Sequence, residues 1–166
     1  MRLALYQPDI PQNAAAVLRL AAGLGLPVDI IDPCGFLWDD RRLRRVAMDY
    51  PSKVKTERHV NWSCFRDAVG ERGARVILLT TAGAVAHVDF AFRPDDVLLL
   101  GREGSGVPEA IHAAADARVT VPMAPGVRSF NVVTAAAMVA GEALRQTGGW
   151  PAAVASEVSP ARGRAP

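Results

Sequence analysis

The sequence predicts one α/β domain with a mostly parallel sheet and helices on both faces of the sheet. Short apolar runs bounded by turn residues are typical of buried parallel strands, and four stand out: Met1–Tyr6, Val28–Ile31, Arg75–Thr80 and Val97–Leu100. Helical patterns separate these runs, and strands that alternate with helices indicate the α/β class. A chain of 166 residues, of which 50% are hydrophobic, is long enough to bury a single core.

Four stretches carry the helical pattern. They are Ala14–Leu24, for which Asn13 is a candidate N-cap, Asn61–Val69, Pro108–Ala115 and Asn131–Thr147. Proline is favoured in the first turn of a helix because its missing N–H would be unpaired there. The last stretch is rich in alanine and poor in charge, so we expect it to be buried against the sheet or against another subunit.

Two more short strands, Val54–His59 and Arg118–Val121, complete the pattern, and residues 1–149 are expected to form the domain. The remaining segment, residues 150–166, has prolines, alanines and scattered charge without a clear period, so we expect a disordered tail. No apolar run approaches the length of a transmembrane helix, and the N-terminus lacks the long apolar region of a signal peptide.

The sequence carries no recognisable disulfide or metal-binding pattern. Cys34 and Cys64 give neither a disulfide framework nor a metal-ligand spacing, which favours a reducing, cytoplasmic location. His59, His87 and His112 lie far apart, so we predict structural roles for them and no bound metal. A net charge of +2 permits a nucleic-acid partner without requiring one.

The glycine-rich segment after the strand Val97–Leu100 is the first candidate binding loop. Gly101, Gly104 and Gly106 follow the strand, and Pro108 opens the next helical stretch. In open α/β sheets, ligands bind at the carboxyl ends of the strands. The spacing matches neither the G-x-G-x-x-G pattern nor the phosphate-binding loop, which disfavours NAD and ATP. An ordinary tight turn and a ligand-binding loop are both open for this segment.

A second loop of the same kind follows the strand Arg118–Val121. Arg128, Ser129 and Asn131 lie where the chain enters the last helical stretch. Asn131 can serve simply as a helix cap. Together with the glycine-rich segment, these small polar groups can also enclose an adenine-bearing cofactor, while apolar side chains supply the contact area.

A basic stretch, Asp39–Met48, contains Arg41, Arg42, Arg44 and Arg45 and is expected to form a short helix. Charged side chains on an exposed helix face are routine in soluble proteins. The same four side chains would also suit a patch that binds the phosphates of a nucleic acid.

Three stretches, taken in order, resemble the SPOUT methyltransferase superfamily in its SpoU branch of RNA ribose methyltransferases. They are Ile10–Asn13 with Arg19 on the helix that follows, Leu100–Pro108, and Val121–Met123 followed by Arg128–Asn131. Gly35–Arg45 and Met48–Tyr50 are similar to a small, single-domain member of that branch. The similarity extends from Met1 to Thr147, which is nearly the whole expected domain.

The resemblance implies a parallel α/β sheet whose C-terminal part is tied in a trefoil knot. It implies a homodimer with the last helix at the interface and the active site near it, and S-adenosylmethionine as the cofactor, bound across three strand-end loops. The cofactor-binding positions would be Leu79, Gly101, Gly106, Val121, Met123 and Ser129.

The activity that the resemblance implies is methyl transfer to the ribose 2′-hydroxyl of the wobble nucleotide, a cytidine or uridine, in tRNA anticodons. The catalytic set would be Arg19, Asn13, Glu103, Ser129 and Asn131, and RNA would contact Arg41, Arg42, Arg44, Arg45 and Arg128. Because arginine is effectively always protonated, Arg19 is expected to orient a phosphate and to stabilise developing negative charge.

The sequence departs from the family pattern at Ala14–Ala16, at Arg102, where proline is common, and at Gly141, where an aromatic residue is common. These departures bear on RNA contact more than on the cofactor site. The alternatives are the same chemistry on another RNA, such as ribosomal RNA or another tRNA position, and a non-catalytic RNA-binding relative. A nucleotide-binding protein of the flavodoxin or Rossmann type is a third alternative, although its phosphate fingerprint is missing.

Overall fold

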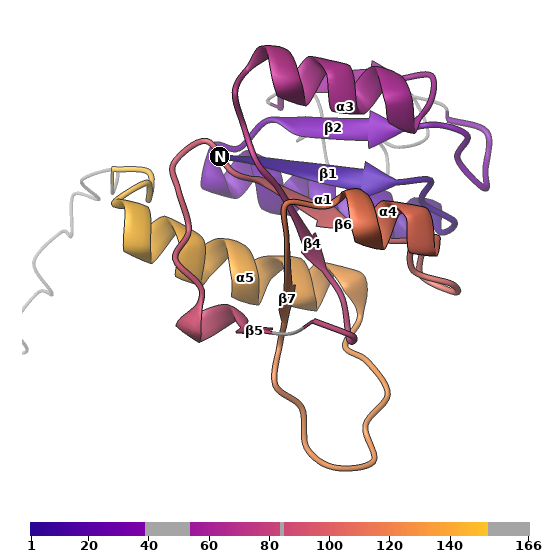
Figure 1. Cartoon of the computed structure of the whole chain (residues 1–166). Helices are drawn as coiled ribbons and strands as arrows, with labels where there is room; N and C mark the ends of the chain where they lie inside the picture. The colour runs from indigo at the N-terminus through magenta and orange to yellow at the C-terminus, as the bar shows by residue number, and fades with distance from the viewer. Residues whose placement is uncertain (39–53, 84, 153–166) are drawn as a thin grey trace, which may run out of the picture.

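The chain folds around one seven-stranded sheet in which the neighbouring strands are parallel (Figure 1). The computed structural model describes residues 1–38, 54–83 and 85–152. The strands are β1 (Arg2–Tyr6), β2 (Val28–Ile31), β3 (Thr56–His59), β4 (Val76–Leu79), β5 (Val85–Ala86), β6 (Val97–Leu100) and β7 (Ala117–Thr120), in the spatial order β3-β2-β1-β6-β4-β7-β5. The helices are α1 (Pro11–Leu24), α3 (Trp62–Glu71), α4 (Glu109–Ala114), α5 (Val132–Thr147) and the short 3-10 helix η2 (His87–Asp89).

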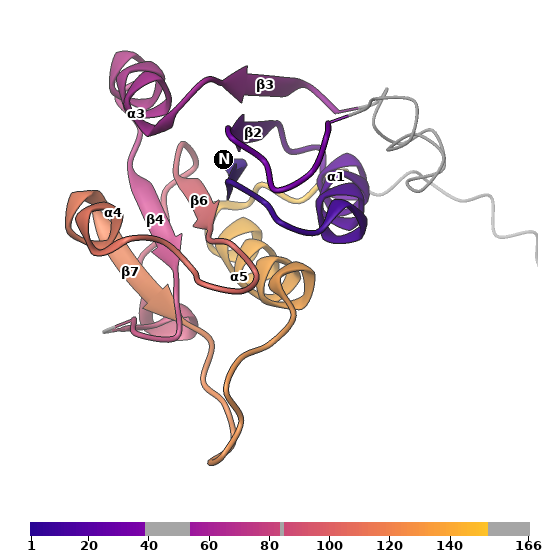
Figure 2. The ribbon, with the colours of Figure 1, turned by 90° about the vertical axis from the view of Figure 1, so that its right-hand side faces the viewer.

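Helices cover both faces of the sheet, as the sequence predicts (Figure 2). Alternate residues of a strand point to opposite faces. Leu98 and Leu100 of β6 therefore pack in the core that α1 and α5 cover, whereas Val97 and Leu99 pack in the core that α3 and α4 cover. All four are at most 1% exposed, which explains why β6 is a continuous apolar run rather than an alternating one.

The sheet order creates a place where two loops diverge. β1 and β6 are neighbours, with Leu5 opposite Leu100, and Leu100 also lies opposite Leu79 of β4. The carboxyl ends of these strands therefore meet at one edge. The chain leaves β1 toward α1 on one face and leaves β6 toward α4 on the other face (Figure 2). Such a switch point opens a crevice at the strand ends.

The first helix begins earlier than the sequence predicts. α1 starts at Pro11, with Ile10 as its N-cap, so the prediction that Asn13 caps the helix is wrong. Proline fits the first helical position, because its fixed φ is already helical and the N–H it lacks would have no partner. Asn13 is thereby placed in the first turn, where its side chain is free to bind another loop.

The other helix ends follow their sequence signals more closely. Asn61 is the N-cap of α3 and accepts a hydrogen bond from the N–H of Cys64 at 2.9 Å. Asn131 is the N-cap of α5 and accepts from the N–H of Val133 at 2.8 Å. Pro108 is the N-cap of α4 rather than part of the helix.

Smaller differences concern the strands and the segments at the end of the described chain. β3 begins at Thr56 instead of residue 54, β7 covers Ala117–Thr120 instead of 118–121, and β5 and η2 were not predicted. The expected basic helix, residues 39–48, lies outside the described residues, and so does most of the expected tail, residues 150–166. None of the described helices is long and apolar enough to span a membrane.

Candidate functional site

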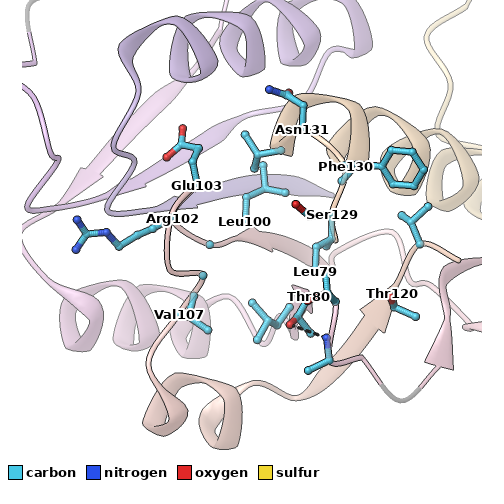
Figure 3. Close-up of a pocket in the computed structure, with 18 of the residues that line it drawn as sticks. Leu79, Thr80, Leu100, Arg102, Glu103, Val107, Thr120, Ser129, Phe130 and Asn131 are labelled. Atoms are coloured by element: carbon cyan, nitrogen blue, oxygen red, sulfur yellow. Dashed lines mark hydrogen bonds between the residues drawn. The ribbon is translucent and has the colours of Figure 1, made fainter. Parts of the chain in front are cut away.

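A pocket of about 640 Å³ lies at the carboxyl ends of β4, β6 and β7 (Figure 3). Its walls are the turn after β4, the loop Gly101–Val107 after β6, and the segment that joins β7 to α5. The first turn of α1 closes one edge through Ile10 and Asn13. The volume lies within the ordinary range for a small-molecule site, and the position is the one that open α/β sheets use for ligands.

All of the residues predicted to bind a cofactor line this pocket. They are Leu79, Gly101, Gly106, Val121, Met123 and Ser129. They come from three loops that are far apart in the sequence and are brought together by the parallel pairing of β4 with β6 and with β7.

The loop Gly101–Gly106 owes its shape to two glycines. The N–H of Arg102 donates to the carbonyl of Gly106 and the N–H of Gly106 donates to the carbonyl of Arg102, both at 2.9 Å. A Cβ on Gly101 would lie 2.9 Å from the backbone of Gly106, and Gly106 itself has a φ of +67°. A side chain at either position would strain this narrow turn, so the glycines keep the pocket wall thin.

Glu103 ties the glycine loop to the start of α1. Its carboxylate accepts hydrogen bonds from the N–H of Asp9 at 2.8 Å and from the side-chain amide of Asn13 at 3.2 Å. The carboxylate therefore lies beside the first turn of α1. Asn13 in turn accepts from the side-chain amide of Asn131 at 3.2 Å. Three predicted catalytic residues, Asn13, Glu103 and Asn131, thus form one hydrogen-bonded chain.

Arg102 has a partner that its place in the sequence did not reveal. Its guanidinium donates to both carboxylate oxygens of Asp9, with Nη2 to Oδ1 at 2.6 Å and Nε to Oδ2 at 3.2 Å. Figure 3 shows this side chain directed away from the pocket, so its backbone lines the wall while its charge binds elsewhere. The Arg102 hydrogen bonds lower the pKa of the Asp9 carboxyl below its ordinary value, with a further contribution from the N–H of Gly104.

The predicted arginines divide into three groups. Arg128 lines the pocket next to Ser129. Arg19 is exposed on α1 and is not among the residues that line the pocket. It follows Asn13 by six positions, which corresponds to about 9 Å along a helix axis. The arginines at positions 41, 42, 44 and 45 lie outside the described residues, so their RNA-binding role stays a prediction.

Thr80, Thr120 and His112 are polar pocket residues that the sequence did not single out. Thr80 and Thr120 lie at the ends of β4 and β7, and His112 lies on α4. The Thr80 hydroxyl accepts from the N–H of Ala82 at 3.2 Å and so shapes the turn after β4. A signal for Thr80 was present in the sequence, because it is the last residue of the predicted strand Arg75–Thr80. His112 gave no such signal, since the sequence suggested only a structural role for it.

A buried cluster outside the pocket has the donor types of a metal site. Asp29, Glu57 and His59 each place one ligand atom within 4.8 Å of the others. Asp29 is fully buried, and Arg2 donates to both of its oxygens at 2.6 and 2.9 Å while His59 Nε2 lies 2.9 Å away. Because the Arg2 guanidinium already neutralises the carboxylate, we interpret this cluster as an ion pair that joins β1, β2 and β3.

The departure at Gly141 has a local structural counterpart. A Cβ on Gly141 would lie 3.7 Å from the ring of Trp150, which packs over α5 at this position. Trp150 is 53% exposed, so an aromatic surface is present here although it comes from nine positions further along the chain. Trp150 is also the first residue of the segment 150–166, whose disorder stays a prediction because most of it lies outside the described residues.

The fold and the pocket together define a class, namely α/β proteins that hold a small molecule at the switch point of a parallel sheet. A model of the SpoU rRNA Methylase family matches residues 1–141. A curated relative, the tRNA (cytidine(34)-2′-O)-methyltransferase of Beijerinckia indica, is 57% identical over 146 residues, which are 88% of this chain and 91% of the relative. This chain belongs to the SpoU rRNA Methylase family.

Solved structures support the same conclusion about the fold. One that concerns 2-OH methylation of C/U34 on tRNA has a TM-score of 0.82 at 41% identity and covers 87% of this chain and 94% of that chain. The SpoU methyltransferase AviRb from Streptomyces viridochromogenes, in complex with AdoMet, has a TM-score of 0.80 at 24% identity and covers 88% of this chain and 60% of that chain. The predicted fold class is confirmed, while the trefoil knot stays a prediction.

Proposed function

We propose that this protein transfers a methyl group from S-adenosylmethionine to the ribose 2′-hydroxyl of the wobble nucleotide, a cytidine or uridine, in tRNA anticodons. The observation that carries the proposal is the pocket at the carboxyl ends of β4, β6 and β7, because residues from three family motifs meet there. The activity named for the curated relative, which matches this chain over most of both lengths, supports the same reaction.

The pocket suits a nucleoside that carries no phosphate. Its side chains with permanent positive charge are Arg102 and Arg128 among the described residues, and Arg102 is already bound to Asp9. Leu79, Leu100 and Val121 offer an apolar surface for an adenine ring. The Glu103 carboxylate, at the edge of the same pocket, complements a positively charged sulfonium. These features fit S-adenosylmethionine and disfavour NAD or ATP.

When bound, S-adenosylmethionine would supply an electrophilic methyl group on a sulfonium. The residues of this chain then have to hold the ribose so that its 2′-oxygen lies in line with that methyl group. Holding the two reacting atoms in line can remove as much as about 7–11 kcal/mol of the barrier. The linked side chains Asn13, Glu103 and Asn131 are preorganised for this task, since each is fixed by hydrogen bonds before any ligand arrives.

The proton of the 2′-hydroxyl must leave as the oxygen attacks. In this proposal Arg19 orients a phosphate of the RNA and stabilises the negative charge that develops on the oxygen. A guanidinium stays protonated at neutral pH, so it serves as a hydrogen-bond donor rather than a base. Arg128, at the pocket, supplies a second positive charge for the RNA backbone.

The curated relative favours tRNA over ribosomal RNA as the substrate, because its name specifies tRNA and it matches this chain over 91% of its own length. The family description names rRNA, and so a ribosomal substrate is the second candidate. The wobble-position reading is preferred because it accounts for the 57% identity to a cytidine-34 enzyme. A cytoplasmic location is part of the same proposal, because a tRNA substrate favours it.

We infer in addition that the protein is a homodimer joined through α5. The outer side of this helix exposes Ala137 and Met138, and Met138 is 40% exposed. Phe130, just before α5, is 38% exposed at the pocket mouth. An exposed apolar strip beside the pocket is suited to a second copy of the chain, which would put the active site near the interface.

The function is tested by nucleoside mass spectrometry of tRNA from cells with and without the gene. We expect the 2′-O-methyl group on the wobble nucleotide to be lost on deletion and restored by the wild-type gene. Loss of a ribosomal 2′-O-methyl group, with the tRNA wobble position unchanged, would instead identify the second candidate. Unchanged methylation in both RNAs would contradict the proposal.

A further inference from the structure

An ion pair between Arg102 and Asp9 joins the glycine loop to the segment just before α1. Arg102 and Asp9 are 93 positions apart, and their side chains are 38% and 27% exposed. An exposed ion pair usually contributes little stability. The geometry here is bidentate, which fixes orientation as well as distance.

Asp9 joins three segments, because it contacts Arg102, Glu103 and Gly35. Asp9 receives two hydrogen bonds from Arg102 on its side chain and gives one from its backbone N–H to Glu103 at 2.8 Å. On its other side Asp9 lies against Gly35, where a Cβ would be 2.8 Å from Asp9 Oδ1. The position of Asp9 is therefore set by the loop after β2, and Arg102 transmits that position to the glycine loop.

We propose that Asp9 and Arg102 are positioning residues for methyl transfer, holding the Glu103–Asn13 hydrogen bond at the edge of the pocket where the ribose must be aligned. The inference rests on the proposed function. Neither side chain touches the reacting atoms, because the Arg102 guanidinium points away from the pocket (Figure 3). Both act through Glu103 and Asn13, to which they are linked by the N–H of Asp9.

This role predicts an effect on turnover rather than on cofactor binding. The backbone hydrogen bonds between Arg102 and Gly106 do not involve the guanidinium, so the pocket wall survives its removal. Removing the guanidinium instead breaks the hydrogen bonds to Asp9, which connect the pocket wall to the segment before α1. A displacement of about 1 Å at a reacting group can cost up to about a hundredfold in rate. We expect the affinity for S-adenosylmethionine to change much less, because backbone and apolar contacts of the pocket would hold most of the cofactor.

The experiment compares Arg102→Ala, Arg102→Lys, Asp9→Asn and the double variant Asp9→Asn/Arg102→Ala with the wild type. Each is assayed for kcat and for the KM of S-adenosylmethionine with tRNA as methyl acceptor, and cofactor affinity is measured by calorimetry. The matched control is Arg66→Ala. Arg66 forms a similar exposed pair with Asp116, 3.1 Å apart and 32% and 39% exposed, between α3 and the turn before β7.

We expect Arg102→Ala to lower kcat at least about tenfold while the KM and the affinity for the cofactor change less than about threefold. Arg102→Lys should recover part of the loss, and the double variant should be no worse than about threefold below Arg102→Ala, because the two residues act as a unit. Arg66→Ala should keep the wild-type kcat.

Three results would overturn the inference. They are a wild-type kcat in Arg102→Ala, an equal loss in Arg66→Ala, and losses in the double variant that multiply as for independent residues. An inactive wild type would contradict the proposed function instead, so the two failures are distinguishable.

Discussion

At the scale of single residues, Glu103 connects two parts of the site that are far apart in the sequence. One carboxylate joins a loop after β6 to the first turn of α1, through the N–H of Asp9 and the amide of Asn13. The sequence marked Glu103 and Asn13 as candidates through their motifs, but it assigned Asn13 to a helix cap. Pro11 overrides that assignment, because a proline at the first helical position fixes where the helix starts.

Gly101 gives the residue-scale prediction. Gly101→Ala would place a Cβ 2.9 Å from the backbone of Gly106. Backbone atoms cannot move aside as the end of a flexible side chain can. We expect a loss of about 1–3 kcal/mol in the free energy of unfolding and a loss of affinity for S-adenosylmethionine of tenfold or more. Urea denaturation and calorimetry measure the two effects.

Gly104→Ala is the matched control for Gly101→Ala. A Cβ on Gly104 would meet no atom within 4 Å, and its φ is not in the left-handed region. We expect this variant to fold and to bind the cofactor as the wild type does. Equal behaviour of the two alanine variants would argue against the thin pocket wall described above.

Residue roles that depend on distant partners could not be predicted from the sequence. Arg102 lies in a recognisable motif, yet its partner Asp9 is 93 positions away, and no local pattern connects the two. Leu79, Gly101 and Val121 were predicted as cofactor positions through the family resemblance. The structure places all three in the pocket at the strand ends, and their contact with a cofactor stays a prediction.

At the scale of elements, Asn131 is the N-cap of α5, and in the proposed function it also supports Asn13 at the edge of the pocket. Asn131→Ala removes the acceptor for the N–H of Val133 and also the hydrogen bond to Asn13. We expect about 1 kcal/mol less stability from the lost cap. We also expect a fall in kcat of about tenfold, because Asn13 loses a partner at the pocket edge. Thermal unfolding and methyl-transfer assays separate the two.

Asn61→Ala provides the control for that experiment. Asn61 caps α3 through the N–H of Cys64 in the same way, but it does not line the pocket. The variant should lose a similar amount of stability and keep the wild-type kcat. If both cap variants lost activity alike, the role of Asn131 would be structural only.

Long elements were predictable and short ones were not. The runs that became β1, β4 and β6 show clear apolar patterns, and α5 shows its asparagine cap and glycine end in the sequence. β5 has two residues and η2 has three, which is too short for a periodic pattern. Their place is set by packing beside β7 and α5, a tertiary effect that local sequence does not encode.

At the scale of the whole molecule, the strand order could not be read from the chain. Alternating strands and helices indicate a parallel sheet, but many orders satisfy that pattern. In the structure β1 pairs with β6, although seven described elements lie between them along the chain, namely α1, β2, β3, α3, β4, β5 and η2. That pairing creates the crevice in which the site lies.

The proposed dimer predicts that a charge on the exposed side of α5 yields a monomer with reduced activity. Met138→Glu would place a charge on the exposed apolar side of α5, where a second copy is proposed to bind. We expect light scattering to show a monomer, with methyl transfer reduced at least tenfold, since desolvating an unpaired charge opposes association. Val60→Glu puts the same charge on a residue that is 73% exposed beside α3, and it should remain dimeric. A dimeric Met138→Glu protein would contradict this arrangement.

The ion pairs of the surface predict how stability depends on pH. Hydrogen bonds from Arg102 lower the pKa of Asp9, and those from Arg145 and Gln146 lower the pKa of Glu142 to about 2. A carboxyl group whose pKa is lowered by folding stabilises the folded state at any pH above its unfolded pKa, which is about 4. This stabilisation is lost as the pH is lowered through the pKa that the group has in the folded state. The urea concentration at the unfolding midpoint should therefore decrease as the pH is lowered from about 4 to about 2. An increase in that concentration as the pH is lowered would contradict the assignment.

The central claim is methyl transfer to one ribose oxygen, and it is tested most directly with the purified protein, labelled S-adenosylmethionine and a tRNA transcript. The measurement is label incorporation into matched transcripts that carry either ribose or 2′-deoxyribose at the wobble position. We expect incorporation into the ribose transcript and none into the deoxy transcript. Equal labelling of both transcripts, or none of either, would contradict it.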